Sequence, residues 1–66
     1  MQITVNGEIR ESEHTLSVSA LLEELGLAHR RVAVEVNKRI VPRSQHARHM
    51  LAEGDRVEVV QAIGGG

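Results

Sequence analysis

The sequence contains no cysteine and no phenylalanine, tryptophan or tyrosine among its 66 residues. Without cysteine the chain can form no disulfide, thiolate metal site or catalytic thiol. Without aromatic rings it lacks the usual platforms for stacking bases, and its net charge of −1 lacks the basic excess of a nucleic-acid binder. No apolar run approaches the roughly 20 residues that span a bilayer. We therefore expect one small domain that binds neither nucleic acid nor membrane.

Alternating apolar residues indicate strands near both ends of the chain. Residues 2–5 (Gln-Ile-Thr-Val) alternate with a period of two, as a half-buried strand does. The next pair, Asn6-Gly7, favours a tight hairpin because both positions of a type I′ turn need positive φ. Residues 56–60 alternate again, which places Glu58 and Val60 on the face opposite to Val57 and Val59.

Helical spacing is clearest in the segment that follows the hairpin. Four apolar residues at i, i+3, i+4 and i+7 share one helix face: Val18, Leu21, Leu22 and Leu25. Ser17 is a suitable N-cap, since its hydroxyl can accept from an unpaired amide of the first turn. Gly26 stands where a left-handed residue would end the helix. The pattern predicts a helix over residues 17–25.

The rest of the chain supplies further strands. Residues 32–36 are β-branched and mostly apolar, which favours a central strand. Residues 40–41 form a short strand that Pro42 ends, and a turn of helix is expected around residues 46–51. The order ββαβ(β)β predicts a two-layer α+β domain with one helix covering a small mixed sheet. If the first and last strands pair centrally, the architecture is the β-grasp.

The body of the chain shows no catalytic signature. His46 and His49 are three residues apart without an apparent third ligand, so we interpret them as solvated surface histidines rather than a metal site. Ser17 is better explained as a helix cap than as a nucleophile. Glu23 and Glu24 diverge by about 100° on a helix, which makes them a solvated face and not an acid–base pair.

The tail carries the strongest functional signal. Gly64, Gly65 and Gly66 directly follow an expected strand, and three glycines at a given position arise by chance roughly 3 times in 10,000. One interpretation is a frayed terminus or an expression scar. The other is a functional strip, because residues without Cβ can thread a narrow channel. Its terminal carboxylate becomes reactive once adenylation supplies a leaving group that a sulfur nucleophile can displace.

Several segments together resemble a known family. They are residues 1–7, the helix at 18–25, the stretch Val-Asn-Lys-Arg-Ile-Val-Pro-Arg at 36–43, residues 53–59 and the diglycine end. The chain is similar to the ubiquitin-like sulfur carriers of the MoaD/ThiS superfamily, and most closely to those of thiamin biosynthesis. Members often carry an aromatic residue shortly after the proline, where this chain has His46. The resemblance implies a β-grasp domain over residues 1–63 and a flexible glycine tail over residues 64–66.

The resemblance also implies a function without catalysis by this chain. Gly66 corresponds to the residue whose carboxylate an E1-like enzyme adenylates before it becomes a thiocarboxylate. The sulfur would come from a donor protein and pass to thiazole synthase, in the cytoplasm. The chain itself would bind no cofactor or metal, because ATP and magnesium belong to the activating enzyme. Gly64 and Gly65 would thread that enzyme's channel.

Docking contacts and other functions stay open at this point. Val60 and Ala62 are candidate contacts on the sheet face away from the helix, although Val60 could instead fill a satellite cluster. Ile63 could anchor the channel entrance or simply pack at the strand end. The remaining functional alternatives are a carrier for molybdopterin synthesis or tRNA thiolation, a ubiquitin-like modifier of target lysines, and an interaction domain with an inert tail.

Overall fold

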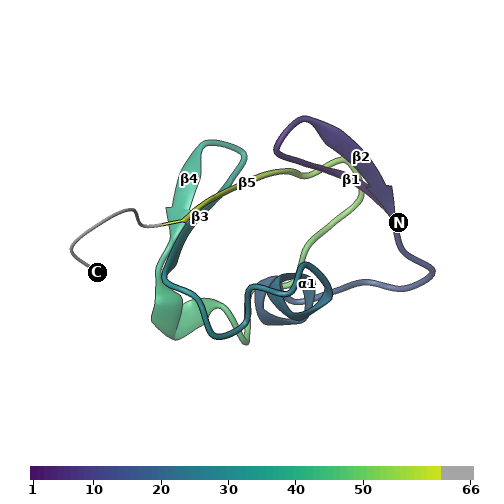
Figure 1. Ribbon diagram of the computed structural model, residues 1–66. Helices are drawn as coiled ribbons and strands as arrows, with labels where there is room; N and C mark the ends of the chain where they lie inside the picture. Colours follow the sequence, from purple (N-terminus) through teal and green to yellow (C-terminus); the bar gives the residue numbers. More distant parts are fainter. Residues whose placement is uncertain (62–66) are drawn as a thin grey trace.

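The protein folds as a five-stranded mixed sheet with an α-helix packed against one face (Figure 1). The computed structural model describes residues 1–61, and residues 62–66 lie outside the described part. The elements are β1 (Gln2–Val5), β2 (Glu8–Glu11), α1 (Val18–Glu24), β3 (Val32–Val36), β4 (Arg39–Val41), a 3₁₀ turn (Arg43–Gln45) and β5 (Arg56–Gln61).

The sheet has the order β2-β1-β5-β3-β4, so the first and last strands lie side by side at its centre. β1 and β5 are parallel, whereas the other neighbouring strands are antiparallel. A parallel pair needs a crossover, and the segment that contains α1 and the β3–β4 hairpin provides it. The predicted α+β class and β-grasp arrangement are confirmed.

Two hairpins of the same kind form the two sides of the sheet. In the β1–β2 turn, Asn6 and Gly7 have φ angles of 51° and 84°, as a type I′ turn requires. In the β3–β4 turn the same left-handed conformation falls on Asn37 and Lys38, at 53° and 69°. The Asn6-Gly7 pair predicts the first turn, whereas the second places a lysine where the first has a glycine.

Helix α1 spans Val18–Glu24, one residue shorter at each end than the predicted range 17–25, whose end residues Ser17 and Leu25 are the caps. The Ser17 hydroxyl accepts a hydrogen bond of 3.0 Å from the Ala20 amide, which satisfies one of the free donors of the first turn. At the other end, Gly26 has a φ of 75°, and the Leu27 amide donates to the Leu22 carbonyl at 2.8 Å. This bond and that from Gly26 to Glu23 form a Schellman motif, which closes the helix after two turns.

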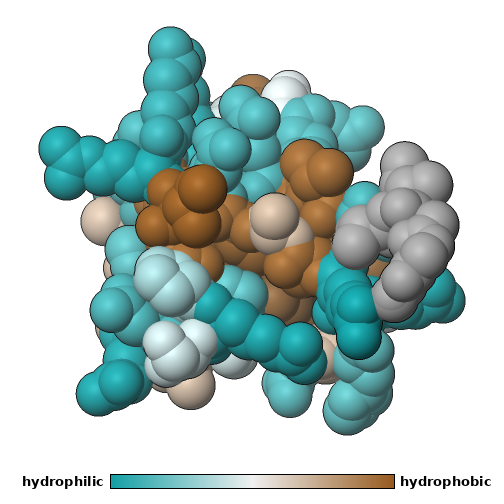
Figure 2. All heavy atoms as spheres, turned by 90° about the vertical axis from the view of Figure 1, so that its left-hand side faces the viewer, coloured by the Kyte–Doolittle hydropathy of each residue, from teal (hydrophilic) through white to brown (hydrophobic). Residues whose placement is uncertain are grey.

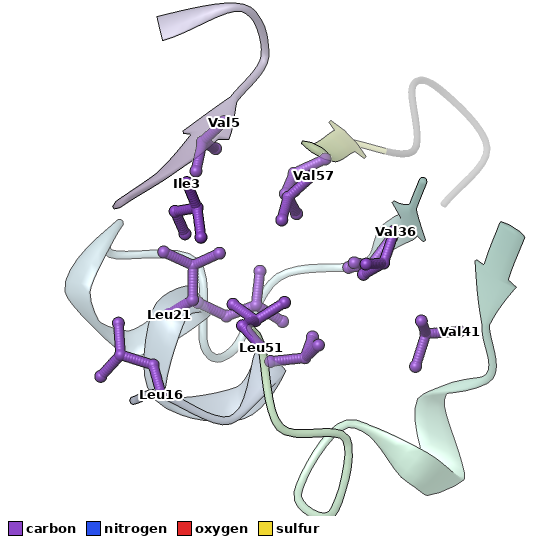
Figure 3. Packing of buried hydrophobic residues seen from close by; sticks show 12 residues of the cluster. Ile3, Val5, Leu16, Leu21, Val36, Val41, Leu51 and Val57 are labelled. Carbon is purple, nitrogen blue, oxygen red and sulfur yellow. The ribbon is translucent and has the colours of Figure 1, made fainter. Parts of the chain in front are cut away.

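The core lies between α1 and the inner face of the sheet (Figure 3). Val18 and Leu21 of the helix are completely buried, and they meet valine and isoleucine side chains from the strands. Each such side chain contributes about 1.5–3 kcal/mol relative to full exposure. The buried hydrophobic residues are Ile3, Val5, Leu16, Val18, Leu21, Leu22, Val34, Val36, Val41, Leu51, Val57 and Val59.

The segment after Pro42 differs from the prediction in two ways. His46 is only 7% exposed, so its interpretation as a surface residue is wrong. Its Nε2 atom lies 3.0 Å from the Val41 carbonyl oxygen, and because a carbonyl only accepts, Nε2 is the donor. His49, in contrast, is partly exposed.

The helical turn expected around residues 46–51 lies earlier than predicted, because the 3₁₀ turn spans Arg43–Gln45 and the His49 amide donates to the Gln45 carbonyl at 2.8 Å. The carbonyls of His46 and His49 accept hydrogen bonds from the Ser19 and Val18 amides of α1. They are therefore not free to close a local helix of their own.

Candidate functional site on the last strand and the outer sheet face

Strand β5 is the element that leads directly to the glycine tail, and it is held from both sides. Its pairing with β3 runs from Val57 to Gln61, along nearly the whole strand. Its pairing with β1 is confined to Arg56 and Val57. Beyond Val57, the side of β5 that faces β1 therefore needs another kind of support.

The side chain of Asn6 supplies that support. Its Oδ1 accepts from the Val59 amide at 2.8 Å, and its Nδ2 donates to the Val59 carbonyl at 3.2 Å. The Asn6 side chain thus makes two hydrogen bonds to the β5 backbone that a further residue of β1 would otherwise make, at a point where the β1 pairing has ended. This contact spans 53 positions of sequence, and it ties β5 to the first hairpin shortly before the described residues end.

A second asparagine holds the start of the strand. Asn37 accepts from the Arg56 amide at its Oδ1 and donates from its Nδ2 to Asp55, both at 3.0 Å. Asp55 also accepts from the Ala52 amide at 2.8 Å, which closes the turn before β5. Both clamping asparagines stand in left-handed turn conformations, so one residue type sets each hairpin and also the position of β5. The Asn6-Gly7 signal predicts the backbone at Asn6, and it predicts neither of the two contacts with β5.

The outer sheet face, which we define by Ala33, Glu35, Ile40, Glu58 and Val60, lies opposite to α1. These positions alternate with the buried valines of β3, β4 and β5. Ile40 is 72% exposed and Val60 is 59% exposed, although both are large and apolar. Figure 2 views the molecule from the side of β4, where hydrophobic atoms gather in the middle and hydrophilic side chains surround them.

The structure locates one of the three docking residues expected from the sequence. Val60 lies exposed on the face away from the helix, so the alternative that it fills a satellite cluster is wrong. Ala62 and Ile63 lie outside the described residues, as do Gly64, Gly65 and Gly66. The sequence does not identify Ile40 as an outward-facing residue, because a strand of three residues is too short for alternation to show which side chain faces outward.

Within residues 1–61, no group of three His, Asp or Glu side chains lies close enough to hold a metal ion. No helix in that part of the chain is long and apolar enough to cross a membrane. Among the described residues, Asn37 holds the start of β5 at Arg56 and Asn6 holds its later part at Val59. The outer sheet face beside them is apolar and partly acidic.

A family model described as the ThiS family matches residues 3–66, nearly the whole chain. The sulfur carrier protein ThiS of Escherichia coli is 36% identical over 66 residues, which cover all of both chains. A crystal structure of the thiamine biosynthesis protein ThiS from Geobacter metallireducens superposes with a TM-score of 0.85 at 33% identity, and each chain is covered completely.

Two further relatives are longer proteins. The thiazole synthases of Paramagnetospirillum magneticum and Magnetococcus marinus are 47% and 44% identical to this chain over its full 66 residues. The chain spans only 20% of the length of each of these relatives. A region similar to the whole of this chain therefore occurs within proteins that are named for the synthase.

Proposed function

Because the chain belongs to the ThiS family, we propose that it is a sulfur carrier of thiamine biosynthesis and that the Gly66 carboxylate carries the sulfur. The family match, which runs through Gly66, is the observation that supports this proposal most directly. The composition agrees with it, since a sulfur carrier without cysteine must hold sulfur on another group. We propose no catalytic residue in this chain, which serves as a co-substrate of its partners.

The proposed chemistry takes place at the terminal carbonyl carbon. The Gly66 carboxylate oxygen attacks the α-phosphorus of ATP on an E1-like adenylating enzyme, and pyrophosphate leaves. When hydrosulfide attacks the resulting acyl adenylate, a C–S bond forms, the C–O bond to AMP breaks and a proton is released. The product is a thiocarboxylate, and this step requires no oxidation or reduction. ATP and magnesium are substrates of the partner in this scheme, and a sulfur-donor protein supplies the nucleophile.

In this proposal the glycine tail enters the partner's channel and the outer sheet face provides the docking contact. Gly64 and Gly65 carry no Cβ, which suits them to a channel too narrow for side chains. Ordering the tail in that channel costs conformational entropy, and a docked surface offsets that cost. Val60 is exposed and precedes the glycine tail by a few residues in the sequence, and we propose it as a contact together with Ala62 and Ile63.

Thiazole synthase is the proposed acceptor of the sulfur. Two relatives that contain a region like this chain are themselves named thiazole synthase. Covalent linkage raises the effective concentration of two modules that act on each other, which gives such a fusion a physical advantage. Both partners belong to the cytoplasm in this proposal.

Intact mass spectrometry tests the proposal directly. The purified chain is incubated with the adenylating enzyme, ATP, magnesium and sulfide, and we expect a mass gain equal to the exchange of one oxygen for sulfur, localised to Gly66. A variant with one residue added after Gly66 should show no gain, because its carboxylate is displaced from the adenylation site. An unchanged mass in the complete chain, or adenylation of the untrimmed extended variant at the native rate, contradicts the proposal. Lysine conjugates in cell extract would instead indicate a protein modifier.

A further inference from the structure

The side chains that react most readily with an activated acyl group are almost absent from this sequence. Thiols and amines are the usual nucleophiles of this kind, and the chain contains no cysteine and a single lysine, Lys38. The other seven of its eight cationic residues are arginines. An arginine guanidinium stays protonated and has no free electron pair for attack on a carbonyl carbon. The chain therefore carries nearly all of its positive charge on groups that do not become acylated.

Lys38 lies at the end of the sheet where β5 begins. It is exposed in the β3–β4 turn, and the amide of the neighbouring Asn37 donates to the Arg56 carbonyl at 2.7 Å. From Arg56, β5 runs away from this turn to Gln61, a separation of about 17 Å at roughly 3.3 Å per residue. The residues that follow Gln61 span at most about 18 Å when fully extended. They bring Gly66 near Lys38 only by turning back and running extended along the whole strand.

The amino terminus, the other amine of the chain, lies still farther from the end of β5. The Gln2 carbonyl accepts from the Gly54 amide at 2.7 Å, which places it beside the turn before β5. Figure 1 shows the N-terminus on the side where β5 begins. The Met1 ammonium group is partly buried and donates to the Ser12 carbonyl at 2.6 Å. It must give up this contact and a proton before it can act as a nucleophile.

Two arginines, in contrast, lie beside the end of β5. Val32 is the register partner of Gln61, and Arg31 directly precedes Val32 in the chain. Arg30 and Arg31 are both exposed, and neither forms an ion pair within residues 1–61. No contact in the described structure therefore requires a guanidinium at these two positions. A lysine amine in either place would lie well within the span of the residues that follow Gln61.

We propose that the chain is protected against acylation by its own activated end, because it carries arginine beside the end of β5 and keeps both amines at the opposite end of the sheet. This inference rests on the proposed function, since only an activated Gly66 needs such protection. An amine within reach would attack the Gly66 carbonyl carbon of the acyl adenylate. A C–N bond would form, the C–O bond to AMP would break and the amine would lose a proton. The resulting amide is stable, so that chain could no longer accept sulfur.

Lysine substitutions at the two ends of the sheet test this inference without a partner enzyme. The full chain is prepared with Gly66 as a thioester of a small thiol, and intact mass spectrometry follows formation of the internal amide at mildly alkaline pH. Arg31→Lys places an amine beside the end of β5, and the matched control Arg39→Lys adds the same amine next to Lys38. We expect the amide to form about tenfold faster in Arg31→Lys, because a short flexible tether gives the amine a high effective concentration. The wild type should react no faster than the control.

The same variants are then incubated with the adenylating enzyme, ATP and magnesium in the absence of sulfide. We expect Arg31→Lys to accumulate a product lighter by one water, and to yield less thiocarboxylate than Arg39→Lys once sulfide is added.

The failures of this inference and of the proposed function can be told apart. Equal rates of amide formation in the two thioester variants, or no amide in either, overturn the inference. If Arg31→Lys forms the amide as a thioester but not while it is being adenylated, the partner protects the activated end, and the inference is again overturned. A wild-type chain that is never adenylated overturns the proposed function, whatever the thioesters do.

Discussion

The two faces of the sheet differ sharply although the same strands build both. On β5, Val57 and Val59 point inward and are buried against α1, whereas Glu58 and Val60 point outward. The buried side chains of the inner face are all apolar and come from β1, β3, β4 and β5. The outer face mixes exposed apolar residues with Glu35 and Glu58, which are register partners. Alternation thus lets one strand support the fold on one side and present exposed side chains on the other.

This difference shows where the chain is free to vary without unfolding. Large side chains on the outer face make few contacts within the domain, so their presence is not explained by stability. Exposed apolar side chains that gather on one face are typical of interaction surfaces. The outer face is therefore where changes in sequence should alter partners rather than folding.

The strongest test of this comparison replaces one large residue on each face. Leu21→Ala removes buried methyl groups from the centre of the core and should lower the free energy of unfolding by about 2–5 kcal/mol. Ile40→Ser on the outer face should change it by no more than about 0.5 kcal/mol. Urea unfolding followed by circular dichroism measures both, since the chain lacks tryptophan. Similar losses from the two variants would remove the distinction between the faces.

A substitution in the tail should affect transfer and leave both faces intact. Gly65→Ala adds a Cβ to the strip proposed to thread the partner's channel. We expect thiocarboxylate formation to slow about 100-fold, as a misplacement of about 1 Å can do, with an unchanged free energy of unfolding. A time course by mass spectrometry measures the rate. A wild-type rate in this variant would show that the channel tolerates a side chain.

The clasp between Asn6 and β5 should contribute less than the core. Asn6→Ala removes the hydrogen bonds to both backbone groups of Val59. It also places alanine at a φ of 51°, a left-handed conformation that asparagine tolerates better because its side chain can form local hydrogen bonds. We expect a loss of about 2 kcal/mol, with about half that for Asn6→Gly, which adopts the turn freely. Chemical unfolding compares the two. Equal losses would assign the whole effect to the hydrogen bonds and none to the backbone.

The exposed ion pair between the hairpin and the helix should matter least. Arg10 and Glu24 lie 3.2 Å apart, with side chains 37% and 45% exposed. We expect Glu24→Gln to lower the free energy of unfolding by no more than about 0.5 kcal/mol, with a smaller effect at high salt. Unfolding at two salt concentrations measures this. A loss near that of Leu21→Ala would mean that surface charge, and not the core, holds the helix on the sheet.

Local sequence signals were sufficient to predict most of the helices, strands and turns of the fold. Ser17 and Gly26 mark the ends of α1, and Asn6-Gly7 marks the first hairpin, because each acts on backbone groups within a few residues. His46 could not be placed in this way. Its burial depends on the Val41 carbonyl and on packing under the first turn of α1, which are contacts that no local pattern contains.

The candidate site was predictable in part for the same reason. The alternation of residues 56–60 shows that Val60 opposes Val57 and Val59, and the structure confirms its exposure. Ile40 gave no comparable signal, because its strand contains three residues and either apolar residue could face the core. The clasp of Asn6 on Val59 joins positions far apart in the chain, so only the parallel pairing of β1 and β5 brings them together.

The sequence by itself excluded cysteine chemistry and showed the glycines at 64–66, the caps of α1 and the alternation of the strands. These features depend on residue type or on spacing within one element. The tertiary structure alone decided that Val41 and not Ile40 faces inward, and that Glu35 stands opposite Glu58. Both depend on strand register, which is set when segments distant in sequence bury one common apolar face against the helix.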